Sequence, residues 1–329
     1  MSYIKSIIAG FTAGIAIVAM GMTSSVSAAE IRVSYETSDT HLKARTVDIF
    51  KKELEEATGG DLTVATFPNS SLVPSKQEVS AAIRGQVDAI VPFISYYESI
   101  TSTAKLLTTP LVFKDYDHLT RAMEGKVGDA IFADLEAKGL KPLGFWYETP
   151  TLLFTSERRI STLEELEGLK IRTYPSQTLE SMLGALGANA TVIPGNEVYM
   201  ALQNGTVDGA VTTPSFAVSL KLDEVLNYAV DVNLVLGGYI FALNKGYYDD
   251  LSPEMQSAVV EAAAVATEWN KAEIVNEISV SFDKAAQNGL EVIPVDPAET
   301  KKWQVAMSSV YEELDDELKA LLEKARSYQ

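Results

Sequence analysis

An order of strands and helices that occurs twice is the feature that most restricts how this chain can fold. Residues 31–91 alternate between short strand-like runs and segments with apolar residues at helical spacing, in the order strand, helix, strand, helix, strand. Residues 169–211 follow the same order. Units of this kind build parallel sheets, and ligands bind at the carboxyl ends of their strands. The sequence therefore predicts an α/β protein of two lobes with a ligand cleft between them.

Local signals mark the helices of these units. Ser75 and Glu78 have the spacing of a capping box, which predicts that a helix begins there. Ser176 is expected to cap a helix of the second unit. The segments 78–88 and 197–208 also share a helical stretch, a glycine and a following Val-Asp pair. This similarity fits either a duplicated unit or independent use of the same helix–glycine–strand chemistry.

The later part of the chain is expected to connect the lobes. Residues 239–243 have the pattern of a strand that returns to the first lobe. Ser252 and Pro253 begin a helical pattern that continues to about Gln287, long enough to span both lobes. We therefore expect lobe I and lobe II to divide the chain as follows: lobe I at 30–150 with a return segment at about 236–278, and lobe II at 151–235 with C-terminal helices at about 279–329.

The N-terminus has the pattern of a secretory signal peptide, expected at residues 1–29. Lys5 precedes an apolar run over residues 7–20, and small residues follow up to Ala28 and Ala29. The run is short for a membrane span, so an uncleaved anchor is the weaker alternative. We expect cleavage after Ala28 or Ala29 and a mature protein in the periplasm. The chain has no cysteine, which excludes disulfides, thiol catalysis and a lipid-carrying thiol.

The charge of the chain restricts how it can bind an acid. Without residues 1–29 it has 26 basic and 45 acidic residues, a net charge of −19, which repels nucleic acid and anionic ligands at long range. An acid must therefore meet concentrated positive charge. Arg172 is the candidate, because it ends a predicted strand just before a helix N-terminus, which favours anions. Its guanidinium can hold a carboxylate with two hydrogen bonds. An outward-facing arginine paired with a surface glutamate is the alternative.

No pattern of catalytic or metal-binding residues stands out. The two histidines, His41 and His118, are far apart in the sequence, and the motifs of nucleotide-binding loops, serine hydrolases and zinc proteases are missing. His118 is expected on the surface, whereas His41 is a candidate for the cleft. We therefore expect no catalytic residue, no metal and no cofactor.

Three segments resemble the solute receptors of tripartite ATP-independent periplasmic (TRAP) transporters, namely residues 166–172, 186–189 and 197–209. The resemblance covers the mature chain. It implies a two-lobed periplasmic-binding-protein fold, a long helix crossing both lobes, and integral-membrane TRAP permease subunits as partners that use an ion gradient. It also implies that Arg172 holds the carboxylate of the ligand and that the stretch containing Thr212 and Thr213 contacts the ligand.

The predicted pocket is aromatic and poor in further charge. Sugar-acid receptors of this family often have a second arginine where this chain has Leu152, and Phe93 occupies a cleft position. We therefore expect an aromatic or otherwise apolar monocarboxylate, because unpaired hydroxyls or a second carboxylate are costly to bury. Trp146 and Phe216 are further rings in this pattern, and some of the rings are expected to be core instead. The side chains expected to bind the ligand are Arg172, Thr212, Thr213, Tyr35, Phe93, Tyr96, Tyr147, Tyr174 and Tyr239.

Three alternatives stay open at this point. In the first, the chain is a receptor whose ligand is a sugar acid instead of an aromatic acid. In the second, it is a secreted enzyme that acts on a small carboxylic acid. In the third, it is a module of similar fold that binds a protein partner. An enzyme would change the ligand during prolonged incubation, whereas a receptor returns it intact.

Overall fold

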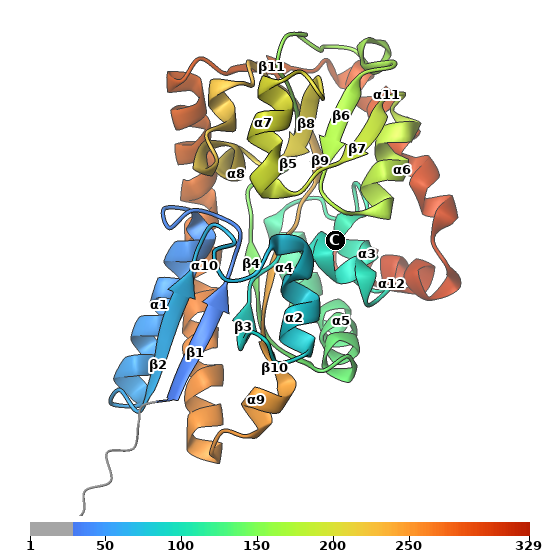
Figure 1. Cartoon of the computed structure of the whole chain (residues 1–329). Coiled ribbons are helices and arrows are strands. Elements are labelled where there is room, and N and C mark those ends of the chain that lie inside the picture. Colours follow the sequence, from blue (N-terminus) through green and yellow to red (C-terminus); the bar gives the residue numbers. More distant parts are fainter. Residues whose placement is uncertain (1–28) are drawn as a thin grey trace, which may run out of the picture.

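The structure is a computed structural model that describes residues 29–329. The expected signal peptide lies outside the described residues except for Ala29, which begins β1. Within the described part, no helix is both long and apolar enough to cross a membrane. The chain forms two sheets flanked by helices, which confirms the expected two-lobed α/β fold (Figure 1).

The first sheet has five strands in the order β2-β1-β3-β10-β4. β1 is parallel to β2 and β3, as the first strand–helix unit predicts, while β10 runs antiparallel to β3 and β4. β10 is the return strand expected from the sequence. The strands are β1 at Ala29–Ser34, β2 at Leu62–Phe67, β3 at Ala89–Ile90, β4 at Leu140–Tyr147 and β10 at Gly238–Asn244.

The second sheet has six strands in the order β11-β9-β5-β8-β6-β7. β6 is parallel to β7 and β8, as the second unit predicts, and β5 runs antiparallel to β8 and β9. The strands are β5 at Thr151–Thr155, β6 at Lys170–Thr173, β7 at Asn189–Val192, β8 at Gly209–Thr212, β9 at Tyr228–Val235 and β11 at Glu291–Pro294.

The helices pack around these sheets and supply most of the connections. They are α1 at Leu42–Ala57, α2 at Glu78–Ile83, α3 at Lys105–Thr108, α4 at Tyr116–Met123, α5 at Lys126–Ala137, α6 at Gln177–Ala185, α7 at Val198–Gln203, α8 at Pro214–Ser219, α9 at Lys245–Asp249, α10 at Pro253–Gln287, α11 at Pro297–Met307 and α12 at Asp316–Arg326.

The capping box expected at Ser75 and Glu78 is not formed. Ser75–Gln77 is a short 3₁₀ turn, and α2 begins at Glu78 without a side-chain cap. The Glu78 carboxylate instead points into the first lobe, where it accepts a hydrogen bond of 3.0 Å from Ser34 Oγ. A partner 44 residues away along the chain has therefore replaced the local one. The Ser176 cap of α6 is confirmed, since its Oγ accepts from Leu179 N–H.

Several segments pass between the lobes. Residues 148–150 join β4 to β5, residues 236–237 join β9 to β10, and α10 runs along both lobes, as the sequence predicts (Figure 1). α10 packs on α1 and β4 at one end and on α8 at the other. Asn270, fully buried in α10, accepts from Tyr147 N–H at 2.6 Å and donates to Thr46 Oγ1 at 3.2 Å. These bonds hold α10 against the first sheet.

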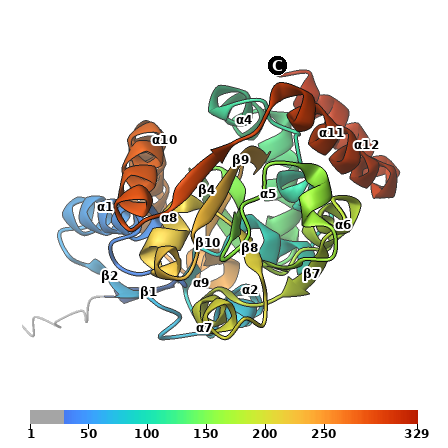
Figure 2. The same ribbon diagram turned by 90° about the horizontal axis from the view of Figure 1, so that it is seen from above.

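The C-terminal helices depart from the expected division of the chain. α11 contacts α6 of the second lobe, but α12 packs on α3 and α5 of the first lobe, on the side of the molecule opposite α1 and α10 (Figure 2). His118 is buried at this contact, where its Nε2 lies 2.8 Å from the carbonyl oxygen of Ala325. The expectation of a surface His118 is therefore wrong, because its ring packs where α12 contacts the first lobe.

Candidate functional site

A small cavity lies between the two sheets, and both lobes line it. Glu36 follows the end of β1 and Phe93 follows β3, while Tyr174 follows β6 and Thr213 follows β8. These are the carboxyl ends of parallel strands, the edge at which α/β sheets bind ligands. The strand–helix pattern thus predicted where the cavity forms. The lining residues are Glu36, Phe93, Tyr96, Arg172, Tyr174, Gly195, Thr212, Thr213, Phe216 and Tyr239.

Arg172 is a buried cation without an acidic partner among residues 29–329. It lies in the second sheet on β6, between β8 and the edge strand β7, and is 1 % exposed. Its Nε donates to the carbonyl oxygen of Ile193 at 2.9 Å and its Nη1 to that of Val211 at 3.3 Å. Nη2 makes no hydrogen bond within the described chain. Burial lowers the pKa of Arg172 to about 10, which shows how poorly this environment solvates the charge.

Two threonines lie beside this cation at the end of β8. Thr212 and Thr213 both line the cavity and are buried. Thr213 caps α8, because its Oγ1 accepts from Phe216 N–H at 3.3 Å, and its own hydroxyl proton stays free to donate. A bound carboxylate can therefore receive hydrogen bonds from the guanidinium and from a hydroxyl.

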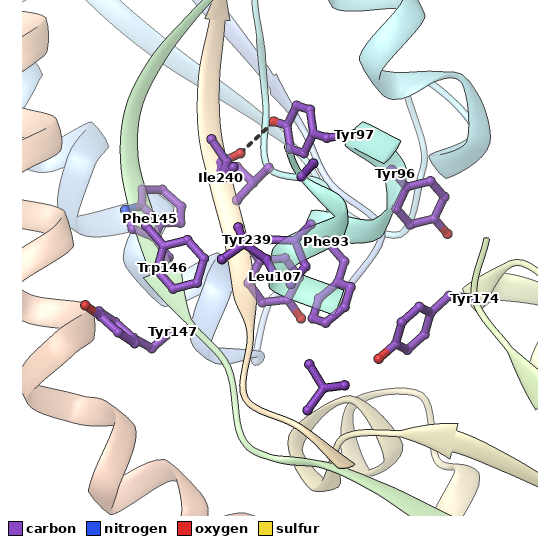
Figure 3. Close-up of a cluster of buried hydrophobic side chains, with 14 of the residues drawn as sticks. Phe93, Tyr96, Tyr97, Leu107, Phe145, Trp146, Tyr147, Tyr174, Tyr239 and Ile240 are labelled. Atoms are coloured by element: carbon purple, nitrogen blue, oxygen red, sulfur yellow. Dashed lines mark hydrogen bonds between the residues drawn. The ribbon is translucent and has the colours of Figure 1, made fainter. Parts of the chain in front are cut away.

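Aromatic rings form much of the remaining wall. Phe93 lies edge-on to Tyr174 at 4.8 Å and to Tyr239 at 5.5 Å between ring centroids, and Figure 3 shows these rings close together, with Tyr96 near them. A main-chain β-bridge between Phe93 and Tyr239 fixes their positions. The hydroxyl of Tyr174 lies 3.2 Å from Thr151 Oγ1. The rings are thus held from both lobes.

Two tyrosines and a leucine expected at the site lie elsewhere. Tyr147 points from β4 toward α10, away from Phe93 and Tyr174 (Figure 3), and packs on Phe145 at 5.2 Å. Tyr35 is buried, and burial together with the neighbouring Asp48 of α1 raises its pKa to about 12. Leu152 belongs to the core of the second lobe. None of the three lines the cavity.

Glu36 is a lining residue that the sequence reasoning missed. Its Oε2 accepts a hydrogen bond of 2.7 Å from Nζ of Lys43, an ion pair that is almost completely buried. The Lys43 ammonium also lies 3.8 Å from the ring centroid of Tyr239. The cavity therefore contains a second charged group, contrary to the expectation of a pocket poor in charge. The position of Glu36 just after a strand is the same signal that identified Phe93.

A second carboxyl lies behind this pair. Glu78 is fully buried, and burial followed by the nearby Glu36 raises its pKa to about 8, against the opposing effect of Lys43. Burial beside Glu36 therefore favours the protonated form of Glu78.

The connection between β4 and β5 holds a buried polar network. Burial acts to raise the pKa of Glu148, but His41 and hydrogen bonds from Ser215 and Tyr239 outweigh it and hold that pKa at about 2. Tyr239 donates to Glu148 Oε2 at 2.6 Å, and His41 Nε2 lies 3.1 Å from the same oxygen. Because Ser215 belongs to α8 and His41 to the start of α1, this network ties the two lobes together at the connection.

Serine, histidine and glutamate meet here, yet their hydrogen bonds oppose nucleophilic catalysis. Nδ1 of His41 accepts from Lys43 N–H at 3.0 Å, so the ring proton of neutral His41 is on Nε2, which faces Ser215 Oγ at 3.1 Å. Ser215 donates its own proton to Glu148. The base that faces the Ser215 proton is therefore Glu148, and its lowered pKa makes it a weak one.

The N-terminus of α6 was expected to attract the ligand, but a protein carboxylate occupies it. Ser176 Oγ donates to Glu98 Oε1 at 2.6 Å, and Thr108 donates to the same oxygen from the first lobe. Burial raises the pKa of Glu98 in spite of these hydrogen bonds. Glu98 of the first lobe thus forms a contact across the cleft with Ser176 of the second lobe.

Comparison with other sequences places the chain in a family. The family model for bacterial extracellular solute-binding protein, family 7, matches residues 33–317. The 2,3-diketo-L-gulonate-binding periplasmic protein YiaO of Escherichia coli is 31% identical over 82% of this chain and 83% of its own length. The C4-dicarboxylate-binding periplasmic protein DctP of Rhodobacter capsulatus is 28% identical over 88% and 87% of the two chains.

Solved structures agree with this assignment. A TRAP periplasmic solute-binding protein from Sulfurospirillum deleyianum with bound succinate has a TM-score of 0.88 and 28% identity, covering 92% of this chain and 100% of that one. A counterpart from Xanthobacter autotrophicus with bound β-D-galacturonate has a TM-score of 0.86 and 26% identity, covering 91% and 100%. The chain belongs to family 7 of the bacterial extracellular solute-binding proteins and is the substrate-binding protein of a TRAP transporter.

Proposed function

We propose that this protein captures a small organic monocarboxylate in the cavity between its lobes and delivers it to the integral-membrane permease of its transporter. The observation that carries the proposal is the buried guanidinium of Arg172, which has no acidic partner among the described residues. A buried charge is stable only when it is paired and hydrogen-bonded. A ligand carboxylate supplies both, and the free Nη2 is available to receive it.

The other lining groups have definite parts in this proposal. Thr212 and Thr213 donate to the second carboxylate oxygen, while the rings of Phe93, Tyr174 and Tyr239 hold the body of the ligand. Aromatic walls favour a flat or ring-shaped body, because they offer large apolar contact areas and ring-edge geometry. The expectation of an aromatic acid gains support from these walls. A wholly apolar acid fits less well, since it would lie against the Glu36 carboxylate.

The family assignment favours a receptor over an enzyme, and the hydrogen bonds around Ser215 support the same choice. Lobe I and lobe II, divided near residues 148–150 and 236–237, would then close around the acid and open to release it. We infer that the contact between Glu98 and Ser176 forms on closure, because the two residues come from opposite lobes. Export to the periplasm by a cleaved signal peptide completes this proposal.

A screen of organic acids with a chemical check on the ligand tests the function. Purified mature protein is heated with each acid, and a binding acid raises the melting temperature because it stabilises the folded state by mass action. The best acid is then incubated with the protein for a day and analysed by mass spectrometry. The proposal expects a thermal shift with a carboxylate and an unchanged ligand. Failure of every acid, or the appearance of a product, would contradict it.

A further inference from the structure

Glu36 has one carboxylate oxygen that the protein does not use. Lys43 donates to Oε2, but Oε1 has no hydrogen-bond partner among residues 29–329. Glu36 lines the cavity and is 5 % exposed, so water reaches it only through that space. An ionised oxygen in such a place accepts strongly, and a ligand group that donates to it gains affinity.

The cavity is therefore lined by one cation and one anion, which come from different lobes. Arg172 comes from the second lobe and Glu36 from the first, and no ion pair joins them within the described chain. Lys43 already pairs with Glu36. Of the two lining charges, only that of Arg172 is left without a protein partner of opposite charge, which matches a ligand with a single negative charge.

We propose that Glu36 is a specificity-determining residue that selects monocarboxylates carrying a hydroxyl at the end away from Arg172 and excludes dicarboxylates. The proposal rests on the proposed function, because it assumes that Arg172 holds the single carboxylate. A hydroxyl donates to Oε1 of Glu36 and leaves the pair with Lys43 intact. A second carboxylate at that place would face a like charge and would find no free donor.

The same geometry separates hydroxylated acids from apolar ones. An apolar end would remove water from Oε1 of Glu36 and give it no donor in return, which costs about ten- to a hundredfold in affinity. A ligand ammonium satisfies Glu36 as well, but it competes with Lys43 for the same carboxylate. The hydroxyl is the only one of these groups that satisfies Glu36 without disturbing its existing partner.

Two panels of three acids test this selection by calorimetry on the mature protein. The six-carbon panel is 6-hydroxyhexanoate, hexanoate and adipate, and the aromatic panel is 4-hydroxybenzoate, benzoate and terephthalate. Each panel keeps the body and varies the far end between hydroxyl, apolar group and second carboxylate. In whichever panel fits the cavity, we expect the hydroxylated acid to bind at least tenfold more tightly than the other two.

Variants at Glu36 show whether this residue makes the choice. In Glu36→Gln the advantage of the hydroxylated acid over the dicarboxylate should shrink to about threefold or less, because the like charge is gone. If the single variant folds poorly because Lys43 is left unpaired, the double variant Glu36→Gln with Lys43→Met replaces it, since this variant removes both charges. Glu56→Gln, at an exposed acid on α1, is the matched control and should keep the parental ranking.

The outcomes separate this proposal from the proposed function. The proposal for Glu36 is refuted if the parent binds the dicarboxylate or the apolar acid as tightly as the hydroxylated acid, or if it binds neither hydroxylated acid. It is also refuted if the folded Glu36 variants keep the parental ranking of the acids. Loss of all binding in Arg172→Ala together with one of these results leaves the receptor function standing. Unchanged binding in Arg172→Ala refutes the carboxylate site itself.

Discussion

Replacement of Arg172 by methionine should move ligand affinity and folding stability in different directions. The pKa of Arg172 is lowered from 12.5 to about 10 by burial, which corresponds to roughly 3 kcal/mol of unfavourable solvation. Methionine removes that cost. It also leaves the carbonyl oxygens of Ile193 and Val211 without these donors, which costs about 1 kcal/mol each. The ligand-free variant should therefore be as stable as the parent, or up to about 1–2 kcal/mol more stable.

Ligand affinity should fall steeply in the same variant. A carboxylate held by two hydrogen bonds to a charged group loses about 1.5–3 kcal/mol for each, part of which water restores. We expect a loss of about two to three decades in affinity for Arg172→Met, and a partial recovery in Arg172→Lys, which keeps the charge without the two-pronged geometry.

Calorimetry with the best-binding acid and urea unfolding without ligand measure the two effects. Arg84→Met is the matched control, because Arg84 is exposed at the end of α2 and away from the cavity. It should leave the affinity unchanged. The reasoning is refuted if folded Arg172→Met binds the acid as tightly as the parent, or if its ligand-free form is destabilised by several kcal/mol.

Three further predictions follow from buried carboxyls and from the N-terminus. Because the pKa of Glu78 is raised to about 8, the folded protein keeps a proton that the unfolded chain releases above about pH 4.5. The free energy of unfolding measured in urea should therefore fall by up to a few kcal/mol from pH 5 to 8. Glu78→Gln should flatten this pH dependence. A parental profile that is flat or rises over this range would contradict it. Because burial also raises the pKa of Glu98, closure of the ligand-free protein should be coupled to the uptake of a proton by this carboxyl. The radius of gyration of the parent, measured by X-ray scattering, should therefore decrease as pH is lowered from 7 to 5. The Glu98→Gln variant should be compact at both pH values. Equal pH dependence in parent and variant would show that Glu98 is not responsible. N-terminal sequencing of the exported protein should give Ala29 or Glu30 as the first residue, and retention of residues 7–20 would contradict cleavage.

The sequence could predict the sheets because their signals are local. Strand and helix periodicities in residues 31–91 and 169–211 lead directly to the parallel parts of both sheets. The rule for strand ends then places Arg172 and Thr213 beside the cavity, where the structure has them. The helix signals at Ser252 and Pro253 likewise mark the start of α10.

The rest depended on contacts between distant residues. Glu36 follows a strand in a chain with 45 acidic residues, so nothing local separates it from a solvated surface acid until Lys43 is seen against it. The capping box at Ser75 and Glu78 gave way to a hydrogen bond with Ser34, which no local pattern reveals. The position of α12 against the first lobe and the burial of His118 also depend on tertiary packing.

The most direct test of the central claim is a crystal structure of the mature protein with the tightest-binding of the six acids. The account predicts the ligand in the cavity between the lobes, with its carboxylate within about 3 Å of Nη2 of Arg172 and its hydroxyl donating to Oε1 of Glu36. A ligand whose carboxylate lies away from Arg172, or which binds outside this cavity, would contradict it.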